Sequence, residues 1–338
     1  MKKVFNIIVC TFISALVFTS CDVDFDPNEQ WQEQMLVYSL LDQDDDTTFV
    51  RIEKCFLGNG NALRYAKEKD SIYYNPDDLD VKIYVSDEWD TNNIHDTLQF
   101  NYTYTSKTAG DFYSGDDCPI YYCVTKNKLS YWSFYKLVIT NKKTGKQVTA
   151  STYLIADYSI RNSNFTFNNK KASTLNNRMQ IEWTNYDAST NANSRIVGKQ
   201  YQVNIRFNYL ENSAIKHIDI PISRRLNNYS TSVYMNTYAT INDVVSGIST
   251  QLKGKTALGW YTTAPFEIRI LSCDLEMFDY LSINASSTSS LNYRPVYTNI
   301  NGGIGLFAAR RTHISKSFED KQVDGNLKTQ IKSLGLGF

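Results

Sequence analysis

The chain carries no surplus of charge, because 35 Lys and Arg residues balance 35 Asp and Glu residues in a total of 338. It lacks the basic footprint that nucleic-acid-binding proteins present to phosphate groups, so we expect no nucleic acid partner. Glycine and proline are also sparse, at 15 and 6 residues, while 42% of the residues are hydrophobic. This composition excludes a disordered polyelectrolyte and is typical of a chain that folds.

Signals of catalysis and of metal binding are scarce as well. Only three histidines occur, His95, His217 and His313, and each stands alone in its neighbourhood. The sequence has no G-x-S-x-G or H-E-x-x-H motif and no C-x-x-C pair with zinc spacing. Because nucleophilic catalysis needs a base beside the nucleophile, we expect a non-catalytic protein without a cofactor or metal.

Long hydrophobic runs are absent except at the N-terminus. Lys2 and Lys3 precede an apolar run from Val4 to Phe18, which has the layout of a secretory signal and is too short to span a bilayer. Small residues then lead to Cys21, and this junction resembles the lipobox where bacterial lipoprotein signal peptides are cut and the cysteine is acylated, for example with palmitate. We expect residues 1–20 to be a signal peptide and Cys21 to be a lipid anchor; a conventional signal peptide is the alternative.

Acidic residues follow the expected anchor directly. Asp22, Asp24 and Asp26 resemble the surface-export signal of Bacteroidota lipoproteins, and residues 21–34 are predicted to form a lipidated acidic tether. We therefore expect a protein held at the outer membrane by its lipid and exposed on the cell surface. An anchor that faces the periplasm, with the acids serving only as a solvated tether, is the alternative.

Beyond the tether the apolar residues recur with a period of two, which is typical of half-buried strands. Apolar residues at helical spacing predict only three helices, over 241–252, 275–281 and 327–334. The predicted strands are 35–41, 47–57, 81–85, 120–124, 135–139, 147–155, 179–183, 201–209, 217–222, 232–238, 266–271 and 304–309.

The fold class that follows is mainly β, with two β-sandwich-like units of the immunoglobulin or transthyretin kind and minor α-helix in the C-terminal half. We expect an N-terminal β-sandwich-like domain over residues 35–156 and a C-terminal β-rich domain over residues 179–338. The Asn- and Ser-rich segment between them, 157–178, is predicted to be a linker or crossover.

Four cysteines remain after the anchor, Cys55, Cys118, Cys123 and Cys273. In an oxidising compartment an even number permits two disulfides in three pairings. Spacing does not choose among these pairings, and buried free thiols are the alternative.

The acidic turn after the first strand has calcium-like spacing. Asp42, Asp44 and Asp46 occupy the first, third and fifth places of a loop whose twelfth residue is Glu53. The sixth place is Thr47, where the calcium loop needs glycine, and Glu53 falls within a predicted strand. We therefore expect a solvated hairpin turn, with a calcium-binding turn as the alternative.

Two C-terminal segments carry a resemblance to a known family. Residues 272–281, S-C-D-L-E-M-F-D-Y-L, precede residues 296–307, V-Y-T-N-I-N-G-G-I-G-L-F. This short helix followed by an N-I-x-G-G-x-G-x-F strand resembles the signature of a Bacteroidota family of outer-membrane lipoproteins that is classed only as a domain of unknown function. The resemblance implies two β-rich units that work beside a TonB-dependent receptor, and it implies no reaction. Its motif residues are a candidate interface or structural motif: Asn299, Gly302, Gly303, Gly305 and Phe307.

These observations predict a lipid-anchored, non-catalytic accessory or binding protein of the outer membrane, with a TonB-dependent receptor as its expected partner. A surface glycan-binding lipoprotein and an adhesin or surface-fibre component are the alternatives. Glycan capture requires exposed rings that cluster in a cleft, whereas a fibre subunit requires an unpaired strand. The candidate rings for glycan capture are the aromatic pairs Tyr73-Tyr74, Tyr121-Tyr122, Tyr131-Trp132 and Trp260-Tyr261.

Overall fold

A computed structural model describes residues 34–55, 62–87, 89–167, 178–184, 196–226, 234–285 and 296–338 of the chain. The predicted signal peptide, the anchor Cys21 and the acidic residues Asp22, Asp24 and Asp26 lie outside the described residues. Within these ranges the protein is mainly β, with several sheets and few helices, as the period-two pattern predicts, and this is consistent with a β-sandwich-like fold. In the described segments no helix is both long and apolar enough to cross a membrane.

Nine strands form the largest sheet of the described residues. They are β1 (Gln34–Leu41), β2 (Thr47–Cys55), β5 (Asn101–Thr105), β6 (Cys118–Val124), β10 (Gln200–Glu211), β11 (Ala214–Leu226), β13 (Leu258–Trp260), β14 (Phe266–Cys273) and β15 (Ile304–Phe318). Their order is β11-β10-β14-β15-β1-β2-β6-β5, with β13 paired to β10. β1 and β15 run parallel, and the other pairs are antiparallel.

A second sheet packs against the β1 end of the first. It contains β3 (Leu79–Asp87), β4 (Ile94–Gln99), β7 (Ser133–Asn141) and β8 (Gln147–Tyr153), in the order β4-β3-β7-β8. This sheet contributes alternate buried residues such as Ile83 and Ile139, and the large sheet contributes Val37 and Ile52. All four belong to one hydrophobic cluster. The two sheets thus form a sandwich in which side chains from two facing layers share a core.

The helices lie mostly in the C-terminal part. They are α4 (Ile241–Gln251), α5 (Leu275–Ala285) and α6 (Gly325–Lys332), with the short 3-10 turn η2 (Asp320–Gln322) before α6. Short turns also occur in the N-terminal part, where the sequence predicts no helix: α2 (Ala62–Tyr65), α3 (Lys69–Ile72) and η1 (Pro76–Asp78). These turns are too short to produce a helical period in the sequence. A two-stranded sheet of β9 (Arg178–Thr184) and β12 (Tyr234–Thr240) completes the described elements.

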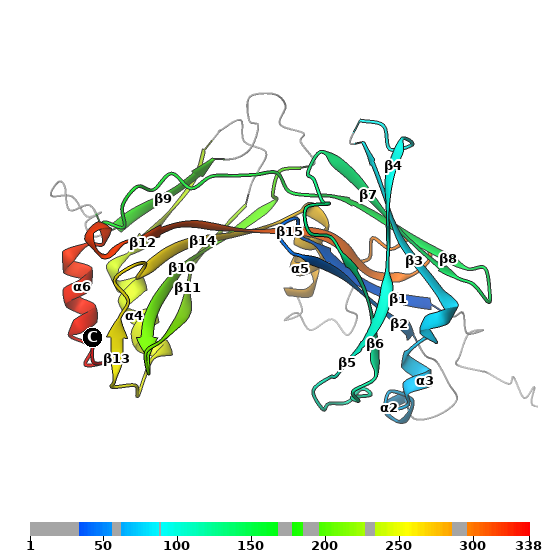
Figure 1. Cartoon of the computed structure of the whole chain (residues 1–338), viewed down its shortest axis with the longest axis horizontal. Helices are drawn as coiled ribbons and strands as arrows, with labels where there is room; N and C mark the ends of the chain where they lie inside the picture. The colour runs from blue at the N-terminus through cyan, green and yellow to red at the C-terminus, as the bar shows by residue number, and fades with distance from the viewer. Residues whose placement is uncertain are drawn as a thin grey trace, which may run out of the picture.

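The large sheet joins the two ends of the molecule. Figure 1 shows β15 extending from the end that holds α4 and α6 toward β1 and the second sheet at the other end. Its first residues pair with β1, with Gly305 opposite Val37, and its later residues pair with β14. The predicted units 35–156 and 179–338 therefore share one sheet.

The segment predicted to be a linker or crossover contributes to the core as well. Phe165 is fully buried, and its ring stacks on that of Phe266 at a centroid distance of 4.4 Å and an interplanar angle of 9°. The backbone around Phe165 also bonds to the segment before α6, since the amide of Phe165 donates to the carbonyl of Gln322 at 3.0 Å. This part of the crossover is anchored by packing and by backbone hydrogen bonds.

The four cysteines of the described chain, Cys55, Cys118, Cys123 and Cys273, are all free, and the last three are buried. Of the two possibilities that the sequence leaves open, the structure has the free thiols. Burial raises the pKa of the Cys273 thiol to about 12, with the carboxylate of Asp274 as the next cause. A thiol with such a raised pKa is a poor nucleophile.

Candidate functional site

The motif residues 299–307 lie where three strands meet. The side chain of Asn299 bridges the start of β15, because its Nδ2 donates to the carbonyl of Phe307 at 2.7 Å and its Oδ1 accepts from the Phe307 amide at 2.9 Å. Asn301 forms a backbone bridge with Thr149 of β8, through hydrogen bonds of 2.7 and 3.1 Å. The segment before β15 is thus hydrogen-bonded both to β15, through Asn299, and to the second sheet, through Asn301.

The glycines of the motif allow close backbone approach to β1. Gly305 has φ +130°, and a Cβ there would collide with the carbonyl oxygen of Val37. A Cβ on Gly303 would lie 2.8 Å from the carbonyl oxygen of Met35. Only glycine fits such positions without moving the neighbouring strand. These contacts within the chain account for Gly303 and Gly305 as parts of a structural motif.

A buried carboxylate holds α5 against this strand junction. Asp274 caps α5 by accepting from the amide of Met277 at 2.9 Å, and its other oxygen accepts from the Ala309 amide at 2.6 Å and from Thr152 Oγ1 at 2.8 Å. The residue is 4% exposed, and burial raises its pKa to about 7 despite these hydrogen bonds. One side chain therefore connects α5, β15 and β8.

A cavity of about 440 Å³ opens at this junction. Its walls come from the outer face of β7 and β8, from the loop before β4, from the first turn of α5 and from the motif. The volume is in the range that small ligands occupy. The lining residues are Thr91, Asn92, Phe134, Lys136, Thr149, Ala150, Ser151, Glu276, Asn299 and Asn301.

The cavity is polar and holds one positive and one negative side chain. Lys136 projects from the middle of β7, and Glu276 lies in the first turn of α5. Within the described residues no ion pair or hydrogen bond engages the Lys136 ammonium, and no ion pair engages the Glu276 carboxylate. Burial raises the pKa of Glu276, and the neighbouring Asp279 raises it further. The one aromatic ring of the lining is Phe134, which packs on Tyr153 with centroids 5.1 Å apart.

Lys136 stands three residues after Ser133, which is the spacing of the S-x-x-K nucleophile motif. Both residues lie on β7, where residues three apart point to opposite faces, and Ser133 is buried while Lys136 is exposed. The strand therefore separates the two side chains, and the spacing does not form a catalytic pair.

The acidic turn between β1 and β2 is a hairpin turn that is solvated only in part, since Asp44 and Asp46 are exposed and Asp42 is not. Asp42 is 2% exposed, and its Oδ2 lies 3.6 Å from Nε of Arg310 in β15. Arg310 also donates to Asp45 at 3.0 Å, and Arg311 Nε lies 3.3 Å from Asp44. These arginines come from a strand more than 260 residues away in the sequence, so no local pattern could reveal the pairing.

The twelfth residue of the calcium-like spacing has cationic partners of its own. Glu53 accepts from Arg51 Nη2 and from Lys107 Nζ, each at 2.7 Å. Among the described residues no group of three or more His, Cys, Asp or Glu side chains is arranged to hold a metal ion.

His95, His217 and the aromatic pairs are not among the residues that line the cavity. His95 Nε2 lies 3.8 Å from Asp87 on an exposed surface, His217 is exposed on β11, and His313 pairs through its backbone with Ile270. Tyr73, Tyr74 and Tyr121 are buried, as expected for rings that cover a sheet. The cluster of rings in a cleft that glycan capture requires is not found at this cavity.

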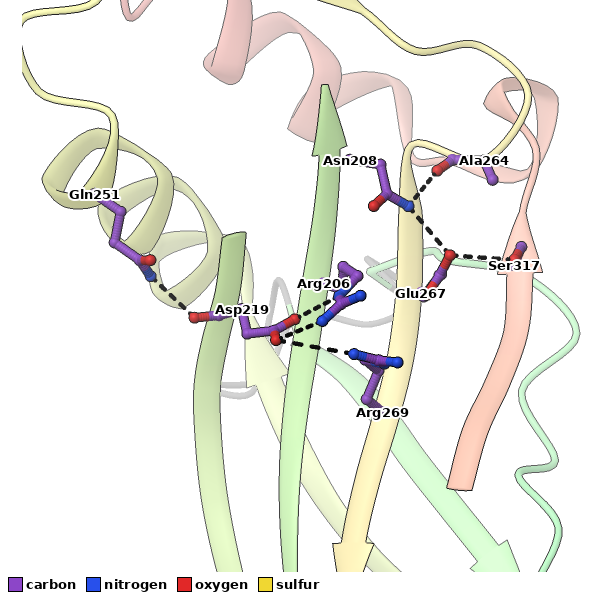
Figure 2. A network of polar contacts seen from close by, with 8 residues as sticks. All are labelled: Arg206, Asn208, Asp219, Gln251, Ala264, Glu267, Arg269 and Ser317. Carbon is purple, nitrogen blue, oxygen red and sulfur yellow. Dashed lines mark hydrogen bonds and ion pairs between the residues drawn. The ribbon is translucent and has the colours of Figure 1, made fainter. Parts of the chain in front are cut away.

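A second polar region lies on the large sheet, and Figure 2 shows it. Arg206 of β10 forms a bidentate pair with Asp219 of β11, with both N–O distances at 2.8 Å, and this pair lowers the pKa of Asp219. Arg269 of β14 approaches the same carboxylate at 4.0 Å, and Gln251 of α4 donates to the carbonyl of Asp219 at 3.0 Å. The sheet-face network comprises these residues together with Asn208, Ala264, Glu267 and Ser317.

Compared with models of known protein families the chain matches none, and no curated protein is detectably similar to it.

Proposed function

We propose that this protein is a lipid-anchored, non-catalytic binding protein of the bacterial outer membrane that works beside a TonB-dependent receptor. The observation that supports binding most directly is the cavity at the strand junction, whose Lys136 and Glu276 lack ion-pair partners in the described chain. Charged side chains at a concave site that the protein leaves unpaired are available to a ligand.

The framework of the cavity also favours a binding role. Its motif wall is held by Asn299 and by the glycines against β1, and α5 is held by Asp274. Walls fixed by such contacts lose little conformational freedom when a ligand binds, which favours affinity. The lining contains no histidine or cysteine that could act as a base or thiolate nucleophile.

The anchor is tested by replacing Cys21. Cys21→Ala should abolish labelling with a radioactive fatty acid and release the mature protein from membranes. Cys10→Ala is the matched control, because Cys10 lies in the expected signal peptide and its loss should leave labelling unchanged. Unchanged membrane association and labelling of the Cys21→Ala protein would contradict the proposal.

Surface exposure is tested separately. The triple replacement of Asp22, Asp24 and Asp26 by Ala should reduce protease accessibility in intact cells and leave fatty-acid labelling unaffected. Unchanged accessibility would mean that the acids are only a tether.

The receptor is tested by co-purification of the wild-type protein from detergent-solubilised outer membranes. A stable complex should contain a TonB-dependent receptor and should survive His95→Ala, His217→Ala and His313→Ala, which are tested one at a time. Any hydrolytic activity lost in one of these variants would contradict the non-catalytic role.

One observation favours a second function, a subunit of a surface fibre. β5 stands at the edge of the large sheet, and all five of its residues are exposed. Such an edge presents unpaired amides and carbonyls to another strand. The amide of Tyr104 faces away from β6, because its partner Pro119 has no N–H to exchange and the Phe100 amide, on the same side of the strand, donates to Val81 of β3. If the protein forms fibres, Tyr104→Pro should abolish them by removing an edge donor, whereas replacement of Lys136 or Glu276 in the cavity should not.

A further inference from the structure

The two charges of the cavity come from two different walls, β7 and α5. Lys136 lies on β7 between Tyr84 of β3 and Ser151 of β8, so it belongs to the wall that the second sheet forms. Glu276 belongs to α5, which packs on β15 of the large sheet and is capped by Asp274. The cavity between these walls therefore has a positive side and a negative side.

Among the described residues, no lysine or arginine forms an ion pair with the acids of the α5 wall. The other carboxyl groups that act on Glu276 and its neighbour Tyr297 are Asp274 and Asp279, so three acids gather here. Asp274 is engaged by three donors from the chain, whereas Glu276 has no cationic partner. A cationic group of a ligand beside Glu276 would neutralise part of this negative charge. An anionic group beside Lys136 would in the same way pair with its ammonium.

The remaining lining suits amide groups better than sugar rings or alkyl chains. Asn92, Asn301 and Ser151 supply side-chain donors and acceptors. Phe134 is the one aromatic ring, so no pair of rings can sandwich a sugar. The volume of about 440 Å³ is small for a protein segment and ample for a short ligand.

We propose that this cavity binds a short zwitterionic peptide, with the ligand's amino terminus at Glu276, its carboxylate at Lys136 and its amides against the asparagines. This deepens the proposed function, because it names the ligand class of the binding site and rests on the protein being a binding protein. A ligand with both charges satisfies both walls at once. A purely anionic or purely cationic ligand leaves one wall unpaired.

The experiment is isothermal titration calorimetry of the mature lipoprotein purified in detergent, with four probes. These are trialanine, N-acetyl-trialanine, trialanine amide and maltotriose. Trialanine should bind, and blocking either end should weaken binding by about 10-fold or more, as expected for loss of a charge-assisted contact. Maltotriose should not bind measurably.

Two variants assign each end of the ligand to its wall. Lys136→Met should bind trialanine and trialanine amide equally well, because the carboxylate no longer has a partner. Glu276→Gln should bind trialanine and N-acetyl-trialanine equally well. Lys216→Met on β11 and Glu68→Gln before α3 are matched controls at exposed sites remote from the cavity lining, and both should behave as wild type.

Equal binding of the blocked and free peptides, binding of maltotriose instead, or no binding of any probe by a protein with a native circular dichroism spectrum would overturn the peptide assignment. These outcomes are distinguishable from failure of the proposed function. If fatty-acid labelling and receptor co-purification succeed while trialanine does not bind, only the ligand class is wrong.

Discussion

The cavity at the strand junction and the sheet-face network of Figure 2 are both polar, but only in the network are the charged side chains paired with each other. In the network Asp219 receives two hydrogen bonds from Arg206 and a more distant contact from Arg269. In the cavity Lys136 and Glu276 have no ion-pair partners among the described residues. Charges paired within a chain stabilise its fold, whereas unpaired charges at a concave surface are available for binding.

The wall of the cavity also depends on close backbone contact between β15 and β1. Gly305→Ala should have the largest effect on stability, because its Cβ would collide with the carbonyl of Val37 and separate β1 from β15. We expect a loss of at least about 4 kcal/mol in the free energy of unfolding, or failure to fold. Urea denaturation followed by circular dichroism measures it. Gly110→Ala is the control, because no atom lies within 4 Å of a Cβ there.

The carboxylates of the two regions should respond to pH in opposite directions. Burial raises the pKa of Asp274 to about 7, so the native state binds more protons than the unfolded state between about pH 4 and 7. The contribution of Asp274 to stability therefore decreases as the pH rises through this window. Between about pH 5 and 8, the free energy of unfolding of Asp274→Asn should therefore fall by about 2 kcal/mol less than that of the wild type. Urea denaturation at each pH measures this difference.

The same variant should also destabilise the protein at the higher pH. The amide of Asn places a donor where the Ala309 amide needs an acceptor, so about 1–3 kcal/mol should be lost at about pH 8. An unchanged pH dependence in Asp274→Asn would mean that this carboxylate does not titrate in the native protein.

In the network, the hydrogen bonds from Arg206 lower the pKa of Asp219, which is partly exposed. The stabilisation is present above the ordinary pKa of an aspartate and is lost as the pH falls through the lowered value. Asp219→Asn should therefore destabilise the protein by about 1–2 kcal/mol near pH 7, with screening by solvent limiting the effect. The difference in the free energy of unfolding between Asp219→Asn and the wild type should become smaller below about pH 4. A loss that is independent of pH would mean that packing, not the ion pair, explains it.

Replacing the cavity charges should have the smallest effect on stability. Because Lys136 and Glu276 form no ion pair in the described chain, Lys136→Met and Glu276→Gln should each change the free energy of unfolding by less than about 0.5 kcal/mol. Thermal and urea denaturation without added ligand measure this. A loss as large as that of Asp219→Asn would remove the contrast between the two regions.

Most strands could be predicted because alternation is a local property. The predicted strand 266–271 is β14 (Phe266–Cys273), and the predicted helix 241–252 is α4 (Ile241–Gln251). β5 (Asn101–Thr105) is missing from the predicted strands although Tyr102 and Tyr104 alternate with polar residues, and all five of its residues are exposed. β15 runs to Phe318, well beyond the predicted end at residue 309, because its polar residues Arg310 and Arg311 are neutralised by acids from elsewhere in the chain.

The motif residues could be predicted as special, but their surroundings could not. Asn299, Gly303 and Gly305 stand out in sequence through glycine spacing, and the structure brings them together against β1 and β8. Lys136 and Glu276 do not stand out, since a lone lysine on a strand and a glutamate at a helix start are common. Their role as cavity charges depends on the walls that surround them, and no sequence signal marks it.

The sequence by itself determined most of the strands and which of their side chains face the core, because both follow from the period of side-chain direction along an extended backbone. Only the tertiary structure decided that β1 pairs in parallel with β15, that Arg310 meets the acidic turn, and that β7 and α5 enclose one cavity. The physical reason is distance along the chain. These contacts join segments separated by more than 100 residues, where burial and charge pairing act between whole sheets and leave no mark on the local pattern.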